Sequence, residues 1–463
     1  MGDLLGRLGP VRAYREIRRD FSRVVLVLAA GDLIASFGFS LVFPFLTIYL
    51  VNAFGATAFE AGLVISGYAV CSIFSGAVGG WLTDRVGRKP VMVVSVGVTG
   101  LVIVLMGQAH DLVQIGVLTV ALGLIDPAFI PAARAAIADV VEEERRPRAY
   151  GLLGVAAAVG WIAGPAIGAG LSVFGYPLLF TIAGVLVSTY AVVAIRWLPE
   201  TRPVRTPATR EPGGGATVTP GGLDPTQLTA GADPALPPSG AASVAERAGG
   251  GRGGRQPADP RRVFAAFLPI AMVVRAAAFL WVTTLPIYAA RSLGVSTSTW
   301  GILFSINGLI IVFFQMRVAT AAERRSKPRV MAVSALMYAA GYACVAVVGS
   351  PALAVPALAG LILLVTLGEM LLFPIEPSFV SDLSPEDRRG RYQGIVLAAT
   401  GIGSAVGPPL GGWLLDTFPG PVAWWATTAT LVGTAVALGA LARLADRLPD
   451  RVSSLPVAAE SSD

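Results

Sequence analysis

Six ionisable side chains interrupt long apolar stretches of the sequence, and they are its strongest candidates for chemistry. They are Asp32, Asp126, Arg134, Arg275, Glu369 and Glu376. If those stretches cross a membrane, each charge costs about 2.5–3.5 kcal/mol at mid-bilayer, so the side chain is expected to face a cavity or a partner and to serve a function. A low-dielectric surrounding favours the neutral form of a carboxyl group, which suits an acid that gains and loses a proton in a cycle.

Reversible protonation is therefore predicted for Glu369, Asp126 and Asp32. A structural alternative stays open, because buried acids and arginines can also pair to hold helices together. Asp32 with Arg275 is one candidate pair of this kind. Such a pair would fix helix packing and would not by itself carry protons.

Other side chains are candidates for contact with a substrate. Arg275, Arg134 and Glu376 could bind a charged group, although the last two lie nearer the ends of their stretches, where pairing at the membrane boundary explains them equally well. The apolar candidates are Phe43, Trp281, Phe304 and Phe373. Each of these aromatic residues could line a cavity or pack against its neighbours.

Residues that typify enzymes and metal sites are scarce. The two cysteines, Cys71 and Cys344, stand in separate apolar stretches without a CxxC spacing, and His110 is the only histidine. There is no GxxxxGK[ST] loop for nucleotide phosphates. We therefore expect no enzymatic activity, no metal site and no cofactor.

The elements that must position these residues are membrane-spanning helices. The chain has 463 residues, of which 54% are hydrophobic and only 14% charged, and its mean hydropathy is +0.69. A soluble domain carries about 25% charged residues. Apolar runs without strand-like alternation predict helices, because in lipid every backbone polar group needs an internal partner. The predicted spans are 24–50, 58–82, 90–109, 112–140, 148–173, 178–198, 264–290, 299–321, 328–349, 354–382, 391–416 and 422–445.

Basic residues mark one side of this arrangement. They crowd the N-terminal arm and the loops that follow even-numbered spans, whereas the opposite loops offer essentially only Arg291. This asymmetry predicts that both termini are cytoplasmic. The formal net charge of +6 is then a signal of topology and gives no reason to expect nucleic acid.

Composition divides the chain into five parts. Residues 201–260 are rich in Pro, Gly, Ala and Ser without apolar periodicity, which predicts a disordered linker between two sets of six helices. The predicted parts are a basic arm 1–23, a bundle 24–199, a linker 200–262, a bundle 263–446 and a tail 447–463. All but the bundles are expected on the cytoplasmic side.

The two sets of helices are related in sequence. A gap-free shift of 243 residues aligns Asp126 with Glu369, Asp139 with Asp382, and the Gly/Pro-rich segment of the fifth span with that of the eleventh. A parallel repeat of six-helix halves is an architecture of secondary transporters, whose substrate site lies near the midplane between the halves.

The loop between the second and third spans reads GWLTDRVGRKP from Gly80. It resembles the GxLaDRxGRK motif of the major facilitator superfamily. The resemblance implies a gating role for Gly80, Asp84, Arg85, Gly87 and Arg88, with Asp139 as the partner of Arg88. Asp84 would meet the N-terminus of the eleventh helix, where negative charge is favoured. Ordinary capping and loop charge pairing is the alternative.

A second motif narrows the resemblance. The fifth span is similar to the GxxxGPxxGG motif of the drug:proton antiporter branch, and the eleventh span repeats it; the residues are Gly160, Gly164, Pro165, Gly168, Gly403, Gly407, Pro408 and Gly411. The packing alternative is a stripe of small residues that lets helices approach closely. Ala169 replaces the last glycine, and Thr119 stands where many members carry a coupling arginine, so the branch's usual proton route is not carried over.

We therefore predict an all-α membrane protein with the major facilitator fold, twelve helices in two related six-helix bundles. It is expected to work as a monomer in the cytoplasmic membrane, in contact with lipids and protons and without nucleic acid. The predicted function is proton-coupled export of small lipophilic compounds, with a cation mildly favoured because the intramembrane acids outnumber the arginines. The alternative is a proton symporter that takes up peptides, sugars or organic anions. A sensor or an intramembrane enzyme is not predicted, because the sequence shows neither an extra folded domain nor a nucleophile with a base.

Overall fold

Twelve long apolar helices dominate the protein, as predicted. The computed structural model describes residues 21–202, 259–323, 325–348, 350–385 and 388–446. Within these ranges twelve helices are long and apolar enough to cross a membrane, and they agree with the predicted spans to within about five residues. Most of the predicted basic arm, linker and tail lies outside the described residues.

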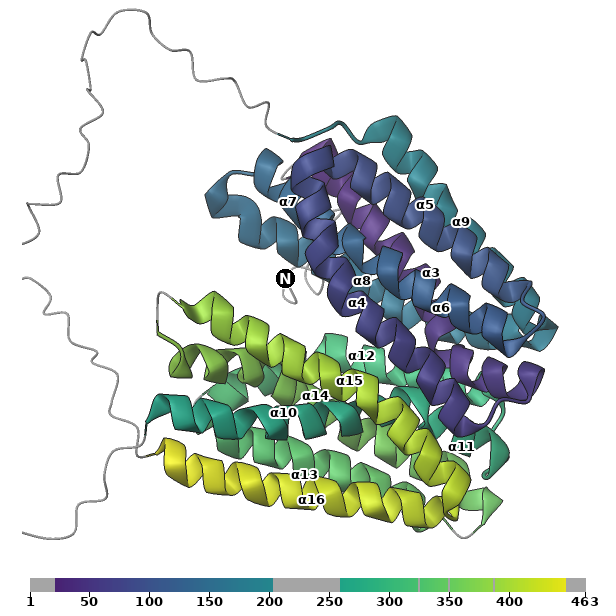
Figure 1. The fold of residues 1–463 in the computed structure, drawn as a ribbon, viewed down its shortest axis with the longest axis vertical. Helices are drawn as coiled ribbons and strands as arrows, with labels where there is room; N and C mark the ends of the chain where they lie inside the picture. Colours follow the sequence, from purple (N-terminus) through teal and green to yellow (C-terminus); the bar gives the residue numbers. More distant parts are fainter. Residues whose placement is uncertain (1–20, 203–258, 324, 349, 386–387, 447–463) are drawn as a thin grey trace, which may run out of the picture. The chain divides into compact units, whose positions relative to one another are not determined.

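The first half contributes six of these spans, shown in purple through blue to teal in Figure 1. The first three are single helices: α3 (Arg23–Phe54), α4 (Ala58–Val86) and α5 (Arg88–Gly107). The fourth combines α6 (Leu112–Ile125), the 3-10 turn η1 (Asp126–Ala128) and α7 (Phe129–Val140). The turn η2 (Glu143–Arg145), α8 (Arg146–Leu171) and η3 (Ser172–Phe174) form the fifth, and α9 (Tyr176–Trp197) is the sixth.

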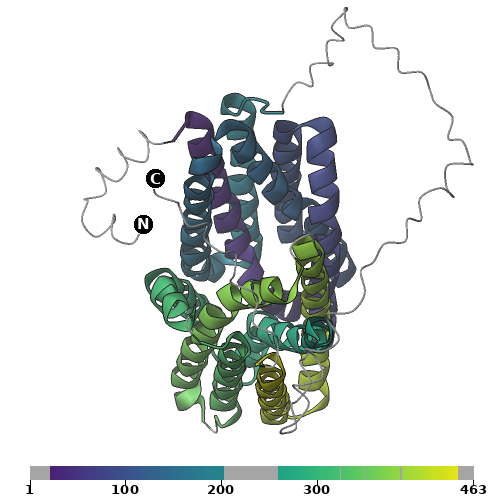
Figure 2. The same ribbon diagram turned by 90° about the vertical axis from the view of Figure 1, so that its left-hand side faces the viewer.

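The second half contributes the other six spans, shown in teal to yellow, and the two sets remain distinct groups in Figure 2. Its first span joins α10 (Pro260–Thr283) to α11 (Leu285–Arg291). Then follow α12 (Thr297–Glu323), α13 (Lys327–Ala346), η5 (Pro351–Leu353) with α14 (Ala354–Leu383), α15 (Arg389–Thr417) and α16 (Gly420–Ala445).

The internal repeat reappears in the way helices pack. In the first half α8 lies against α3, and a Cβ added to Gly160 would stand 2.7 Å from the carbonyl oxygen of Leu33. In the second half α15 lies against α10, and a Cβ on Gly403 would stand 2.3 Å from the carbonyl oxygen of Met272. Only glycine permits such a close approach, so each Gly-rich motif seats its helix on the first span of its own half.

The fourth and tenth spans are equivalent in the repeat. Each accepts a hydrogen bond from a serine of a neighbouring span, but only the fourth is interrupted by a 3-10 turn. Ser95 donates a hydrogen bond to the carbonyl oxygen of Ile125 at 2.8 Å, and Ser334 donates likewise to that of Gly368 at 2.8 Å. The α-helix of the fourth span gives way to a 3-10 turn at Asp126, whereas α14 continues through the matching position. A 3-10 stretch inside a helix often marks a functional hinge or strain.

The two halves touch through α4 with α15 and through α8 with α12. The turns at Gly55, Gly175 and Gly294 lie at one end of the molecule. We call it the arginine-poor end, because the loops on this side offer essentially only Arg291. There the Asp416 carboxylate of α15 accepts hydrogen bonds from the first backbone N–H groups of α4, at Ala58 (3.1 Å) and Phe59 (2.8 Å). A helix N-terminus stabilises a negative charge, so these hydrogen bonds to Asp416 connect the two halves at this end.

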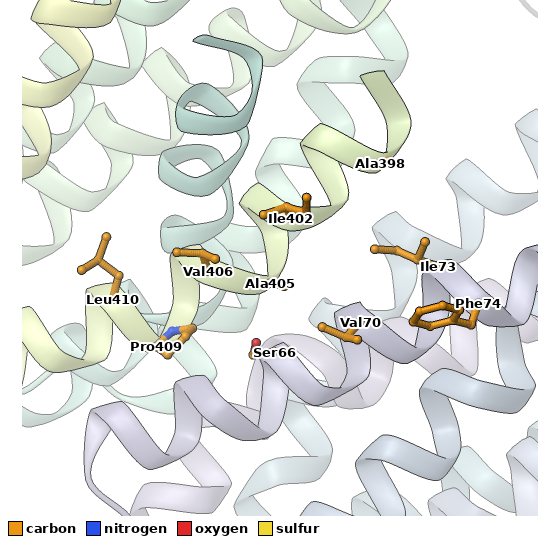
Figure 3. A pocket seen from close by; sticks show the side chains of 10 residues that line it. All are labelled: Ser66, Val70, Ile73, Phe74, Ala398, Ile402, Ala405, Val406, Pro409 and Leu410. Carbon is orange, nitrogen blue, oxygen red and sulfur yellow. The ribbon is translucent and has the colours of Figure 1, made fainter. Parts of the chain in front are cut away.

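A groove of about 620 Å³ runs between α4 and α15 (Figure 3). Its lining side chains are apolar apart from one serine: Ser66, Val70, Ile73, Phe74, Ala398, Ile402, Ala405, Val406, Pro409 and Leu410. Phe74 and Ile402 are more than half exposed, as expected of side chains that face lipid tails. Because the groove has no ionisable side chain, the site chemistry lies elsewhere.

The contact of α4 with α15 gives a first prediction. A Cβ on Gly412 would stand 2.2 Å from the carbonyl oxygen of Ala58, backbone against backbone, so Gly412→Ala should lower the free energy of unfolding by about 1–3 kcal/mol. Thermal unfolding of the detergent-solubilised protein measures this. Gly433→Ala is the control, because a Cβ added at Gly433 on α16 would have no atom within 4 Å; this change should be neutral or stabilising. Equal stability of the two variants would contradict the contact.

Candidate functional site

Glu369 is a buried ionisable group within the spans, and both of its carboxylate oxygens accept hydrogen bonds. It lies on α14 with only 7% of its surface exposed. The Trp281 indole N–H donates to Oε1 at 3.0 Å, and the Asn307 amide donates to Oε2 at 3.0 Å. The same amide also donates to Thr366 Oγ1 at 2.9 Å. Three helices, α10, α12 and α14, therefore meet at this carboxylate.

These hydrogen bonds explain how a carboxylate is tolerated there. Bonds to a charged acceptor are roughly twice as strong as neutral ones, and an unpaired buried charge is costly. Asn307 was not predicted from the sequence, and its signal was an amide side chain within an apolar span, where polar side chains commonly bond across helices.

Glu369 opens on an aromatic cavity of about 380 Å³. All four predicted aromatic residues line it: Phe43, Trp281, Phe304 and Phe373. Trp281 and Phe304 are stacked with ring centroids 4.8 Å apart. Trp161, on α8, closes another part of the wall. The cavity thus combines flat aromatic faces from both halves with one carboxyl group, a setting that can hold an apolar cation by cation–π attraction and charge pairing.

The predicted pair of Asp32 with Arg275 is wrong. Arg275 Nη2 lies 3.7 Å from Glu376 Oε2, and its guanidinium stands 5.4 Å from the Phe373 ring centre. Arg275 and Glu376 belong to packed helices of the second half. Asp32 belongs to the first half, where its electrostatic neighbour is Arg134. Arg134 itself is exposed. Neither arginine lines the aromatic cavity.

Asp32 and Asp126 come together in a second, smaller cavity of about 210 Å³. The repeat places Asp126 and Glu369 at equivalent positions, but each faces a cavity of its own. Trp161 lines both cavities and is the side chain they share. The predicted coupling acids therefore form two groups, one in each half; their part in proton coupling stays a prediction.

The GxLaDRxGRK loop is held within the first half. Arg88 Nε lies 2.8 Å from Asp139 Oδ2, so the predicted contact is present, while its role in gating stays a prediction. Arg88 Nη1 also stands 3.6 Å from Asp84, which is 79% exposed. The second half repeats the arrangement, because Lys327 at the start of α13 pairs with Asp382 near the end of α14.

Glu200, which follows the sixth span, binds the same loop and was not predicted. Its carboxylate accepts backbone hydrogen bonds from Arg88 (3.0 Å) and Lys89 (3.2 Å), the first residues of α5, and from Arg202 (2.9 Å). Partial burial by itself would raise the pKa of Glu200, but the backbone N–H donors outweigh it and lower the pKa below its ordinary value. Glu200 is therefore a charged cap on α5.

The remaining residues of the loop have simpler surroundings. Gly87 has φ of 123°, a conformation that favours glycine, and it forms the turn between α4 and α5. The Arg85 guanidinium stands 5.2 Å from the Trp81 ring centre. Gly80 faces open space. Only Gly87 is thus required by local backbone geometry.

The Gly/Pro motifs act in packing in this structure. The glycines of α8 (Gly160, Gly164, Gly168) contact α3, and those of α15 (Gly403, Gly407, Gly411) contact α10. The backbone carbonyls of Pro165 and Pro408 instead face glycines of the other half, Gly301 and Gly62 respectively. The motifs therefore lie at helix contacts within and between halves, and any role in the direction of transport stays a prediction.

Known proteins resemble this chain over most of its length. A family model described as "Major Facilitator Superfamily" matches residues 28–268 and 267–461. The MFS-type transporter YqjV of Bacillus subtilis is 23% identical over 403 residues, covering 86% of this chain and 88% of the relative. A "Na(+), Li(+), K(+)/H(+) antiporter" of Planococcus maritimus is 24% identical over 420 residues, covering 85% and 91%.

Other matches are partial or structural. The multidrug resistance protein MdtG of Serratia proteamaculans is 33% identical over 194 residues, but the match spans 40% of this chain and 46% of MdtG. The nucleoside transporter NupG has a TM-score of 0.68 at 14% identity, over 91% of this chain and 99% of NupG. A POT family transporter in complex with 5-aminolevulinic acid has a TM-score of 0.69 at 13% identity, over 91% and 96%. At such identities these structures show a shared fold alone.

The network around Glu369 yields a second prediction. Asn307→Leu removes both amide donors and leaves Glu369 Oε2 without a partner, which should lower the free energy of unfolding by about 1–3 kcal/mol. Replacing both partners in Asn307→Leu/Glu369→Leu should cost less than the sum of the single changes, because no unpaired charge is left. Thermal unfolding of the three variants tests this, and strict additivity would contradict the coupling.

The Glu200 cap yields a third prediction, on pH dependence. A lowered folded-state pKa means that the carboxylate stabilises the fold above the ordinary value of 4.5 and that this stabilisation is lost as the pH falls through the folded-state value. Glu200→Gln should therefore melt at a lower temperature at neutral pH, with a difference that shrinks on acidification. The exposed Glu143→Gln is the matched control. A difference that is constant with pH would contradict the charged cap.

Proposed function

Because the chain belongs to the major facilitator superfamily of membrane transporters, we propose that it exports small lipophilic cations across the cytoplasmic membrane in exchange for protons. The observation that carries this proposal is the Glu369 carboxylate at the wall of an aromatic cavity. An apolar cation gains there both charge pairing with Glu369 and cation–π contact with rings such as Trp281 and Phe304.

Exchange follows if a proton and the cation compete for one carboxylate. When Glu369 is ionised, both oxygens accept hydrogen bonds and its charge is available to a cation in the cavity. When it is protonated, one oxygen carries a hydrogen and becomes a donor, so it faces either the Trp281 or the Asn307 donor unfavourably. Protonation thus removes the charge that holds the cation and disturbs the junction of α10, α12 and α14.

The lining of the cavity supports the proposal of cation export over the alternative, uptake of an organic anion. Anion binding would require Arg275 or Arg134 in the cavity, but Arg275 pairs with Glu376 and Arg134 is exposed. The similarity to a multidrug resistance protein and to a Na(+), Li(+), K(+)/H(+) antiporter supports exchange of this kind. Arginines gathered on one side support cytoplasmic termini, which would make the arginine-poor end external.

The central test, our fourth prediction, is transport in proteoliposomes. Purified protein should move the lipophilic cation tetraphenylphosphonium against its gradient when a pH gradient is imposed, and collapse of that gradient should stop transport. Glu369→Gln keeps the size of the side chain but cannot ionise, so it should lose the proton-driven component. Glu369→Asp, which keeps a carboxyl group, should retain part of it.

Protein that is folded yet moves the cation equally well with Glu369→Gln would contradict the assignment of this carboxylate. Transport of an organic anion, with no movement of the cation, would favour the uptake alternative. Each variant is first compared with the intact protein by thermal unfolding, so that loss of activity is not loss of the fold.

A further inference from the structure

No step of the proposed export involves the cleft between α12 and α13. This cleft lies at the turn that joins the two helices, at the end of the molecule opposite the arginine-poor end, and its volume is about 610 Å³. Its polar lining side chains are Arg325, Ser326 and Arg329, at or next to the turn, and we call these three residues the mouth of the cleft. The cleft shares no lining residue with the Glu369 cavity.

The rest of the lining is apolar and extends from the turn into the span. At 1.5 Å of rise per residue, Val318 of α12 and Val333 of α13 lie about 10 Å along their helices from the mouth. Leu371 of α14 forms part of the wall. Val330 is buried and Val333 is exposed, so the apolar wall reaches from the packed interior to the outer surface of the bundle. The cleft thus has a charged mouth and an apolar body.

The equivalent cleft in the first half shows that helix packing does not require the two arginines. Arg325 stands two residues before the first residue of α13, and Arg329 is the third residue of that helix. Val86 and Pro90 hold the same positions relative to α5, and they line a cleft of about 240 Å³ between α4 and α5. The lining of that cleft is apolar apart from two serines. Of these two clefts, only the one in the second half therefore has cations at its mouth.

The charges at the mouth leave one positive charge to be balanced. Arg329 Nη2 lies 2.6 Å from Asp446 Oδ2, next to the end of α16, and both side chains are exposed. Arg325 makes no ion pair with any residue that the structure describes. Ser326 stands at the cap position of α13, yet its side chain makes no capping hydrogen bond. Two guanidinium groups, one carboxylate and an available hydroxyl suit a ligand with a single negative charge.

We propose that this cleft binds one anionic phospholipid, with the headgroup phosphate at Arg325 and Arg329 and an acyl chain along the apolar wall. The planar guanidinium group matches the geometry of phosphate oxygens, and basic pockets between membrane helices bind anionic headgroups. The Ser326 hydroxyl can donate a hydrogen bond to the same phosphate. A free phosphate ion would use the mouth alone, whereas a phospholipid fills both parts of the cleft.

The same charges predict selection by headgroup. A zwitterionic lipid carries an ammonium group beside its phosphate, and the excess positive charge of the mouth disfavours that group. An anionic lipid has no such group and balances the charge. Bound in the cleft, it joins α12, the helix that carries Asn307, to α13 at the membrane surface.

The test, our fifth prediction, is binding of defined lipids to the full-length protein in detergent, counted by native mass spectrometry. Phosphatidylglycerol should occupy one site more tightly than phosphatidylcholine with the same acyl chains. Arg325→Gln/Arg329→Gln should weaken the binding of phosphatidylglycerol about tenfold, because both cations are lost, and should leave that of phosphatidylcholine unchanged. Arg317→Gln is the matched control, because this exposed arginine of α12 lies over the Phe314 ring and outside the cleft; its loss should change neither affinity.

A second variant tests the apolar body of the cleft. Ala321 is exposed and lines the cleft, so Ala321→Phe places a ring there while both arginines remain, and it should also weaken the binding of phosphatidylglycerol. Glycerol phosphate, which has the phosphate but no acyl chain, should not displace the lipid at equal concentration. Thermal unfolding of each variant establishes first that it is folded.

Equal affinity for the two lipids would overturn the inference, and so would unchanged binding of phosphatidylglycerol in the double arginine variant. Displacement by glycerol phosphate as effective as by phosphatidylglycerol itself would show a site for small anions and reject the lipid.

Discussion

A charge inside a membrane protein needs partners, and this requirement joins three helices of the second half at one point. The carboxylate of Glu369 is acceptable among aromatic rings because Trp281 and Asn307, from two other helices, each donate to one of its oxygens. The same bonds hold α10, α12 and α14 together at one point. A change of protonation at that point therefore cannot stay local, which makes the carboxyl group suited to a conformational cycle.

The two halves share their scaffold and differ in their polar contents. Glycine contacts seat the fifth span on the first and the eleventh on the seventh, and a basic residue at the start of the third and ninth spans pairs with Asp139 or Asp382. The acids at the equivalent positions have different surroundings, since both carboxylate oxygens of Glu369 accept hydrogen bonds, whereas the side chain of Asp126 lines its cavity without a hydrogen bond to a described residue. The two halves therefore share their packing, while their cavities differ in chemistry.

Much of this arrangement could be predicted from the sequence, because hydropathy, charge asymmetry and glycine spacing are local or periodic signals. They gave the twelve spans, the repeat, and the aromatic residues that line the Glu369 cavity. Contacts that depend on which helix faces meet were not predictable in this way. The Asp32–Arg275 pair was therefore wrong, and Asn307, Glu200 and Asp416 were missed, since each acts on a helix distant in sequence.

The central claim is that a proton and a lipophilic cation compete for Glu369. It is tested most directly by measuring protons released when tetraphenylphosphonium is added to unbuffered, detergent-solubilised protein. The account predicts that binding expels protons from the intact protein and that Glu369→Gln, even where it still binds the cation, expels none. Binding to the intact protein with no release of protons at any pH at which the protein is folded would contradict it.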